Sequence, residues 1–370
     1  MRSDVVCEKV ARQGSRCRSG AGGGPVGRLR RTIAGLAVAL SVPLTATVGA
    51  AGPAAASYDP AGFDFWVDSG MGPVKTRVFR AADGNTQRVV YALDGLRARN
   101  DLSGWEIDTD ISRTLTQWNI NVVMPIGGQS SFYSDWVSPS SFLGLPPIGS
   151  PVGLASGSGG TQALSGGPGK SYRYEWETFL TRDLRNALRD RLGFNPNGNG
   201  VFGLSMGGGA ALTLAAYHPD QFRYAASYSG YLNPTAPGMP EALRAAMMDA
   251  GGYNIDSMWG LPGDPRWQRH DPTLAAKLLH EHGTRLWISS GNGIPGPRDP
   301  LRGPVDAYHL TNAAVLESIA LGNTRAFQAR WNSLGGGNAT FDYTPIGVHF
   351  WRYWIDQVHK MLPDLSANLG

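Results

Sequence analysis

Cysteine is nearly absent from this sequence, with only Cys7 and Cys17 among 370 residues. Because the chain beyond residue 56 has none, a thiol nucleophile, a thiolate metal site and a disulfide are all excluded there. No group of His, Asp and Glu has the spacing of metal ligands either, so we expect neither a metal nor another cofactor. An apolar core must therefore supply the stability of this part of the chain.

A basic surface is also lacking, although the formal net charge is +4. Residues 1–56 hold eight of the 33 Lys and Arg residues but only two of the 29 Asp and Glu residues, so the rest of the chain carries 25 basic and 27 acidic side chains. A nearly neutral body offers no electrostatic attraction for nucleic acid. We therefore expect no nucleic-acid partner.

The longest apolar run lies near the N-terminus and is short for a membrane span. Arg28, Arg30 and Arg31 precede an uncharged apolar stretch, which small residues follow up to Ala56. This order is typical of a secretory signal peptide, cleaved after Ala56. A membrane anchor is the alternative, but polar residues and a proline interrupt the run. We predict that residues 1–56 are an N-terminal extension with a signal peptide and that the remainder is exported.

Beyond residue 57, short β-rich runs alternate with helical patterns, which predicts a mostly parallel sheet flanked by helices. The predicted strands are 63–68, 75–80, 88–93, 120–125, 200–204, 224–228, 285–289 and 340–343. The predicted helices are 110–118, 177–192, 206–217, 240–250, 273–282, 308–321 and 350–361. We predict a single α/β domain over residues 57–370. Its Gly/Ser/Pro-rich insertion at 138–170 is expected to be a flexible surface loop, with an active-site lid as the alternative.

The segment Gly203-Leu204-Ser205-Met206-Gly207 fits the G-x-S-x-G pattern of a serine nucleophile. A predicted strand precedes it and a predicted helix follows it, so the serine stands on a sharp turn that its glycines permit. This context predicts an α/β-hydrolase fold with Ser205 as nucleophile; a glycine-rich packing or phosphate-binding turn is the alternative. The backbone amides of Leu96 and Met206 are the expected donors to an oxyanion.

A serine nucleophile needs a base, and His349 stands where this fold places it, after the last predicted strand. The other six histidines lie in predicted helices or polar loops, where packing or solvation explains them. The acid that orients the base should lie between the serine and the histidine. Pattern alone leaves Asp299, Asp306 and Glu317 equal.

Long stretches of the sequence resemble the antigen 85 mycolyltransferases, the secreted trehalose mycolyltransferases of mycolate-bearing actinobacteria. The resemblance covers about residues 60–370 and does not depend on any one motif. The matching stretches include Leu93–Ala98, Ser103–Trp105, Val122–Pro125, Gly127–Trp136, Trp176–Thr181, Gly203–Met206, Ala215–Pro219, Asp249–Tyr253, Met258–Gly260 and Gly291–Gly293, with His349, Trp351 and Trp354 near the end.

The resemblance implies an acyltransferase with Ser205, Glu317 and His349 as the catalytic triad, because a Leu-Glu pair stands 32 residues before the histidine in that family, as Leu316-Glu317 does here. It implies that Leu96 and Met206 supply the oxyanion amides. It also implies that a trehalose site contains the side chains Asp94, Arg97, Asp108 and Trp351.

The implied reaction transfers a mycolyl group from trehalose monomycolate to a second trehalose monomycolate or to cell-wall arabinogalactan, with acyl transfer to diacylglycerol as a side activity. The implied protein is a secreted or cell-wall-associated monomer with at most weak binding to host matrix. A secreted carboxylesterase and a non-catalytic matrix- or carbohydrate-binding paralogue are the alternatives. Three positions beside the sugar site depart from the family, namely Arg99, Asp108 and Phe350, and Ser290 stands where the family has a reactive cysteine.

Overall fold

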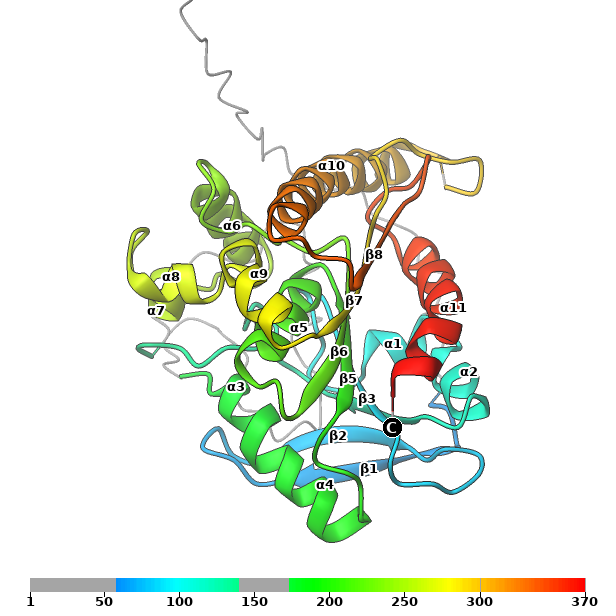
Figure 1. Cartoon of the computed structure of the whole chain (residues 1–370). Coiled ribbons are helices and arrows are strands. Elements are labelled where there is room, and N and C mark those ends of the chain that lie inside the picture. Colours follow the sequence, from blue (N-terminus) through cyan, green and yellow to red (C-terminus); the bar gives the residue numbers. More distant parts are fainter. Residues whose placement is uncertain (1–57, 140–172, 300, 370) are drawn as a thin grey trace, which may run out of the picture. The chain divides into compact units, whose positions relative to one another are not determined.

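A computed structural model describes residues 58–139, 173–299 and 301–369 (Figure 1). The predicted extension and signal peptide, and nearly all of the predicted insertion at 138–170, lie outside the described residues. The strands are β1 (Gly62–Val67), β2 (Val74–Phe79), β3 (Val89–Leu93), β4 (Asn121–Pro125), β5 (Asn199–Leu204), β6 (Phe222–Tyr228), β7 (Arg285–Ser290) and β8 (Ala339–Tyr343). The helices are α1 (Gly104–Ile107), α2 (Ile111–Gln117), α3 (Trp176–Thr178), α4 (Leu184–Leu192), α5 (Met206–Tyr217), α6 (Met239–Asp249), α7 (Asp256–Trp259), α8 (Pro265–Arg269), α9 (Pro272–Glu281), α10 (Pro304–Ser333) and α11 (Trp351–Asn368), with a π-helical turn, η1 (Phe179–Asp183), between α3 and α4.

All eight strands form one sheet in the order β1-β2-β4-β3-β5-β6-β7-β8. The pairs β1–β2 and β2–β4 are antiparallel, and the remaining pairs are parallel. Strands β3, β4 and β5 are buried along their whole length, as is usual for parallel strands covered on both faces. The predicted fold class, a mostly parallel sheet flanked by helices, is confirmed.

Helices cover both faces of this sheet (Figure 1). One face packs against α5, which contacts β5 and β6 and is itself covered by α9. The other face packs against α2 and α11, where Trp105 and Phe202 meet edge to face at 5.1 Å between ring centroids. Two apolar layers therefore fix the sheet, and the loops at the carboxyl ends of its parallel strands can carry chemistry.

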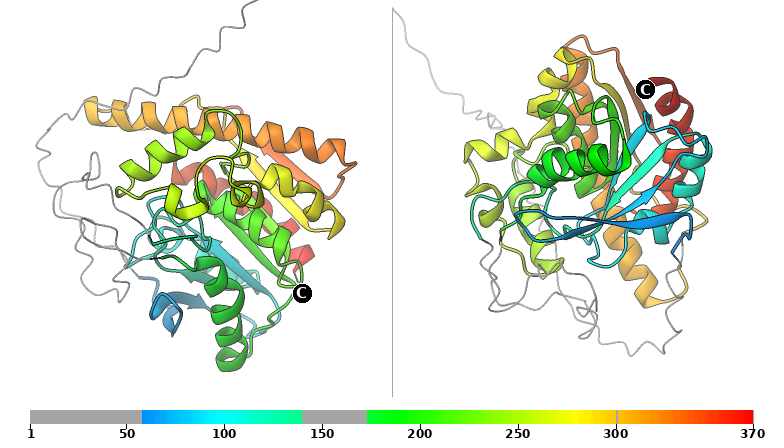
Figure 2. Two further views of the ribbon diagram at one scale, coloured as in Figure 1. Left: turned by 90° about the vertical axis from the view of Figure 1, so that its left-hand side faces the viewer. Right: turned by 90° about the horizontal axis from the view of Figure 1, so that it is seen from below.

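Three short helices, α1, α7 and α8, were not predicted, because a single turn shows no helical periodicity. The predicted helix 308–321 is also too short. In the structure α10 continues through Gly322, because Phe327 and Trp331 beyond the glycine are buried against the core. Figure 2 shows the length of this helix, which contacts α9 and β7. Among the described residues no helix combines the length and apolar character needed to cross a membrane.

Candidate active site

The carboxyl ends of six parallel strands, β3 to β8, meet at one edge of the sheet, and the predicted site residues follow three of them. Asp94 and Leu96 come after β3, Ser205 after β5 and His349 after β8. Strand β4 lies on one side of β3 and strand β5 on the other, so the direction in which successive strands are added to the sheet reverses at β3. A reversal of this kind opens a crevice beyond the strand ends, which is where ligands bind in such sheets.

Ser205 stands on the turn between β5 and α5, and its φ of 52° and ψ of −117° are strained for a residue with a side chain. The two glycines of the motif are required by close backbone contacts. A Cβ on Gly203 would lie 2.4 Å from the backbone of Gly207, and one on Gly207 would lie 2.5 Å from the carbonyl oxygen of Asp94. The sequence pattern therefore follows from a turn in which backbones meet without room for a methyl group.

His349 and Glu317 are brought together from distant parts of the chain. Nδ1 of His349 lies 2.9 Å from Oε2 of Glu317, and both side chains are buried. Burial by itself would raise the pKa of Glu317, but hydrogen bonds from His349, Ser229 and the Gly291 amide lower it overall. The carboxylate is therefore held in its charged form beside the imidazole.

The two other candidate acids are occupied elsewhere. Oδ2 of Asp299 accepts a hydrogen bond from Tyr353 at 2.8 Å, and its Oδ1 lies 3.0 Å from Arg352. Asp306 accepts from the backbone amide of Arg302 at 2.9 Å. Of the three acids that the sequence pattern left equal, the structure therefore places only Glu317 against His349.

The side chains of Ser205 and His349 form no hydrogen bond with each other in this structure. Tyr231 lies beside His349, with its ring nearly parallel to the imidazole at 6.3 Å between centroids. Burial raises the pKa of Tyr231, so its hydroxyl remains protonated at neutral pH. Catalytic hydrogen bonds are often long or absent without substrate and form in the complex.

The loop after β3 places a backbone amide next to the nucleophile. A Cβ on Gly95 would lie 3.7 Å from Cβ of Ser205. The next amide, that of Leu96, donates to no acceptor among the described residues, and Met206 begins α5, so its N–H has no acceptor within the helix. Two N–H groups are thus available near Ser205, as an oxyanion site requires.

A second loop buttresses this arrangement through residues in the left-handed region. Ser130, Phe132 and Tyr133 have φ values of 55°, 52° and 47°. The Ser130 amide donates to the Leu96 carbonyl at 2.9 Å, and the hydroxyl of Tyr133 accepts from the Asp94 amide at 2.9 Å. These bonds hold both ends of the 94–96 turn in place.

Two of the four predicted sugar-site residues are brought together at Gly104. A Cβ there would lie 2.4 Å from the ring of Trp351 and 3.1 Å from Oδ1 of Asp94. Oδ2 of Asp94 accepts from the Gly104 amide at 3.2 Å, while Oδ1 has no partner. Burial raises the pKa of Asp94 to about 7, although the nearby Gly104 amide and Ser103 hydroxyl lower it.

The other two predicted sugar-site residues are not buried with this pair. Arg97 is exposed over more than half of its side chain and forms an ion pair with Asp249 at the end of α6. Asp108 is exposed, and its partial desolvation raises its pKa against the opposing effect of Arg99. The structure thus separates a buried part of the proposed site from a solvent-facing part.

The sequence reasoning gave no role to three residues beside the predicted triad: Ser229, Tyr231 and Trp354. Ser229 and Tyr231 come directly after β6, the strand next to the nucleophile strand, and that position was the available signal. Trp354 lies in the first turn of α11 and its ring meets His349 edge to face at 4.9 Å.

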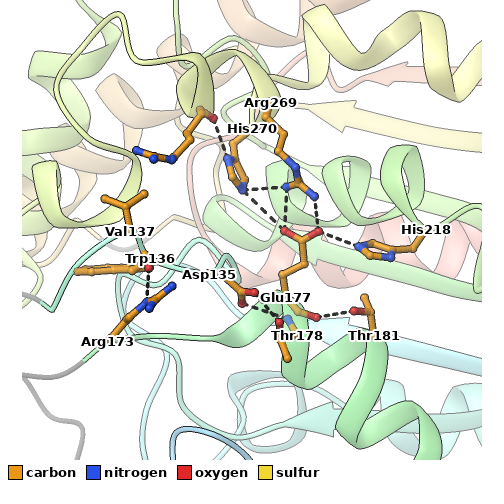
Figure 3. A pocket seen from close by; sticks show the side chains of 11 residues that line it. Asp135, Trp136, Val137, Arg173, Glu177, Thr178, Thr181, His218, Arg269 and His270 are labelled. Atoms are coloured by element: carbon orange, nitrogen blue, oxygen red, sulfur yellow. Dashed lines mark hydrogen bonds and ion pairs between the residues drawn. The ribbon is translucent and has the colours of Figure 1, made fainter.

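A second polar pocket of about 450 Å³ lies around Glu177 and does not include the triad (Figure 3). The Glu177 carboxylate is bound by Arg269 at 2.5 and 2.8 Å and by His218 at 2.7 Å. Burial would raise the pKa of Glu177, but these partners and His270 lower it far below its usual value. Since Arg269 also stacks on Tyr217, the cluster ties α3, α5 and α8 together. Among the described residues no group of acids, histidines or cysteines is arranged to hold a metal ion.

Comparisons with known proteins identify the family of this chain. A family model described as a putative esterase matches residues 73–365. The diacylglycerol acyltransferase/mycolyltransferase Ag85C of Mycobacterium leprae (strain TN) is 40% identical over 287 residues, which are 78% of this chain and 76% of that protein. The corresponding Ag85B of Mycobacterium avium is 38% identical over 347 residues, covering 92% of this chain and 94% of that protein.

A solved structure is similar as well. The crystal structure of Mycobacterium tuberculosis MPT51 (FbpC1) superimposes with a TM-score of 0.66 at 29% identity, covering 84% of this chain and 99% of that one. The resemblance inferred from the sequence is thereby confirmed. The chain belongs to the antigen 85 family of diacylglycerol acyltransferase/mycolyltransferases, within the putative esterases.

Proposed function

We propose that this protein is an acyltransferase that moves a mycolyl group from trehalose monomycolate to a second trehalose monomycolate, through an acyl-enzyme on Ser205. The observation that carries the proposal is the buried pair of Glu317 and His349, 2.9 Å apart, at the strand edge where the strained Ser205 stands. The mycolyltransferase relatives, which align with most of the chain, supply the substrate class.

In the first half-reaction His349 acts as general base. The Ser205 hydroxyl loses its proton to the imidazole, and its oxygen forms a bond to the ester carbonyl carbon. The negative charge moves to the carbonyl oxygen, where the amides of Leu96 and Met206 donate to it. One such donor contributes about 10²–10³ in rate. The C–O bond to trehalose then breaks, and the imidazolium returns its proton to the departing sugar oxygen.

In the second half-reaction a sugar hydroxyl replaces water as the nucleophile. It gives its proton to His349, attacks the acyl-enzyme carbonyl, and Ser205 leaves with a proton from the imidazolium. Transfer exceeds hydrolysis only if the sugar is held at high effective concentration. We assign this holding to Asp94 and Trp351, which meet at Gly104, with Arg97 and Asp108 toward solvent.

The direct test is incubation of the purified chain with trehalose monomycolate, followed by lipid chromatography and intact-mass analysis of the protein. We expect trehalose dimycolate, free trehalose, and a protein whose mass has increased by one mycolyl group. Ser205→Ala should form neither the dimycolate nor the adduct. Free mycolate as the sole lipid product would show a carboxylesterase instead, and activity in Ser205→Ala would refute the nucleophile. No turnover and no adduct in the wild type would favour a non-catalytic paralogue.

We further propose that the chain is exported and acts at the cell wall, with arabinogalactan hydroxyls as a second acceptor class. The support for export is the charged, apolar and small-residue order of residues 1–56. N-terminal sequencing of the protein from culture medium and from the cell-wall fraction tests this proposal. A first residue close to Ser57 is expected, whereas an intact leader in the membrane fraction would show an anchor.

A further inference from the structure

The two carboxylate oxygens of Glu317 have different surroundings. Oε2 faces His349, whereas Oε1 accepts hydrogen bonds from the hydroxyl of Ser229 at 2.7 Å, from the amide of Gly291 and from the hydroxyl of Ser290 at 3.2 Å. Three donors on one oxygen fix the rotation of the carboxylate. The orientation of Oε2 toward His349 therefore depends on what holds Oε1.

The hydroxyl of Ser229 is directed by a further residue. Nε1 of Trp354 lies 2.9 Å from Oγ of Ser229. An indole N–H can only donate, so Oγ must accept from it, and the hydroxyl proton of Ser229 is left for Glu317. The two hydrogen bonds therefore run in one direction, from the indole N–H of Trp354 to Ser229 and from the hydroxyl of Ser229 to Glu317.

Ser290 differs from Ser229 in this respect. Its single hydroxyl proton has two acceptors of similar distance, the carbonyl of Gly291 at 3.0 Å and Oε1 of Glu317 at 3.2 Å. No donor-only group fixes its direction. Its bond to the carboxylate is therefore shared, while that of Ser229 is committed.

Trp354 contacts the other half of the pair as well. Its ring meets the imidazole of His349 at 4.9 Å with an interplanar angle of 85°. Ser229 sits at a φ of 52°, an unfavourable backbone conformation for serine, and is buried. A strained backbone of this kind persists where surrounding contacts impose it, and such positions cluster at functional sites.

We propose that Trp354 and Ser229 form a directed hydrogen-bond relay that positions Glu317, so that its second oxygen stays on His349. The proposal rests on the assignment of Glu317 and His349 to the triad. Both residues are positioning residues, because neither contacts the substrate or the attacking oxygen of Ser205 in this arrangement.

The decisive variant is Ser229→Gly, because glycine is favourable at a φ of 52° and removes the hydroxyl without adding strain. The rate of Ser205 modification by a fluorophosphonate probe reports the triad directly. In that reaction the serine oxygen bonds to phosphorus, fluoride leaves and the proton passes to His349. We expect the rate constant to fall about 10- to 100-fold, the effect of losing one hydrogen bond to a charged group. Relief of the strained backbone at residue 229 should offset part of the stability lost with the two hydrogen bonds, and the labelling rate of the protein that remains folded should still fall, which a merely structural role would not produce.

Trp354→Phe tests the first link, since it keeps a ring against His349 and removes the N–H. We expect a loss of similar size, and little further loss in the Ser229→Gly, Trp354→Phe double variant, because both changes break one chain. Trp287→Phe is the matched control: its indole N–H donates to Gln357 at 3.2 Å, away from the triad. Ser290→Ala should cost less than Ser229→Gly.

Labelling within twofold of the wild type in Ser229→Gly, or fully additive losses in the double variant, would overturn the relay. The outcome is separable from that of the transfer reaction, because the probe needs no sugar and no mycolate. Wild-type protein that labels at Ser205 but makes no dimycolate would refute the proposed transfer and leave the relay standing. Wild-type protein that does not label at Ser205 would refute both.

Discussion

Replacing Glu317 by glutamine changes one atom of the triad, and the structure dictates where that atom goes. Three donors surround the Oε1 position, those of Ser229, Ser290 and the Gly291 amide. Only the amide oxygen of the glutamine can satisfy them, so its NH₂ group must face Nδ1 of His349. That nitrogen then has to accept, which leaves the imidazole proton on Nε2. In this tautomer His349 cannot take the proton of Ser205.

The expected loss in kcat is about 10³- to 10⁴-fold, the size seen when the acid of a serine triad becomes an amide and traps the wrong tautomer. This corresponds to about 4–5.5 kcal/mol of transition-state stabilisation. The fold should tolerate the change. The glutamine has nearly the same volume and keeps its Oε1 contacts, so the free energy of unfolding should change by only about 1 kcal/mol.

The assay is turnover of trehalose monomycolate, with urea unfolding measured on the same preparations. Asp299→Asn is the control, because that acid is equally buried but bonds Tyr353 and Arg352 instead of His349. It should keep kcat within about threefold. If Glu317→Gln retained more than a tenth of kcat, or if Asp299→Asn lost as much, the assignment of the acid would be wrong.

Three further results are expected from the packing and charges. Gly207→Ala places a methyl group 2.5 Å from the Asp94 carbonyl oxygen and should lower the free energy of unfolding in urea by about 1–3 kcal/mol. Gly322 has open space around it inside α10, so Gly322→Ala should raise the free energy of unfolding by about 0.5–1 kcal/mol. The fold raises the pKa of Asp94 from 3.8 to about 7, so ionisation of this side chain opposes folding. The stability of the wild type should therefore fall relative to that of Asp94→Asn, by up to about 4 kcal/mol, as the pH rises from about 4 to about 7, and the difference should be constant above that range. A difference in urea unfolding that does not change with pH would contradict the buried carboxyl. Glu177→Gln should lower the free energy of unfolding by about 1–3 kcal/mol at pH 7, because it leaves the partly exposed Arg269 poorly paired. The kcat of the folded enzyme should not change. A loss of kcat without a loss of stability would show that the pocket around Glu177 takes part in the reaction.

The helices and strands that were predicted well from the sequence are those in which burial requires nearly every residue to be apolar or small. Strands such as β3 and β4 are apolar on both faces, and α5 runs from Met206 to Tyr217 as predicted, since glycines begin it and apolar residues fill it. The ends of α10 were wrong, because Gly322 resembles a stop when its distant packing partners are unknown. Short helices such as α7 depend on tertiary contacts and have no pattern of their own.

Some residues of the candidate active site could likewise be predicted from the sequence, and others could not. The turn that carries Ser205 was predictable because it needs glycines at fixed spacing, and the position of His349 after β8 because chain order restricts it. Family resemblance was needed to choose Glu317. Ser229 and Tyr231 were marked only by their position after β6, and Trp354 only by the family resemblance, since their contacts join residues far apart in the sequence.

The fold class and the strand-turn-helix around Ser205 could be predicted from the amino-acid sequence, because backbone crowding and burial act on neighbouring residues. The folded structure was needed to see the contact between Glu317 and His349, the Leu96 amide that has no acceptor among the described residues, and the indole N–H that directs the hydroxyl of Ser229. These are relations between strand ends that lie far apart in the chain, and they exist only once the parallel sheet has brought its loops to one edge.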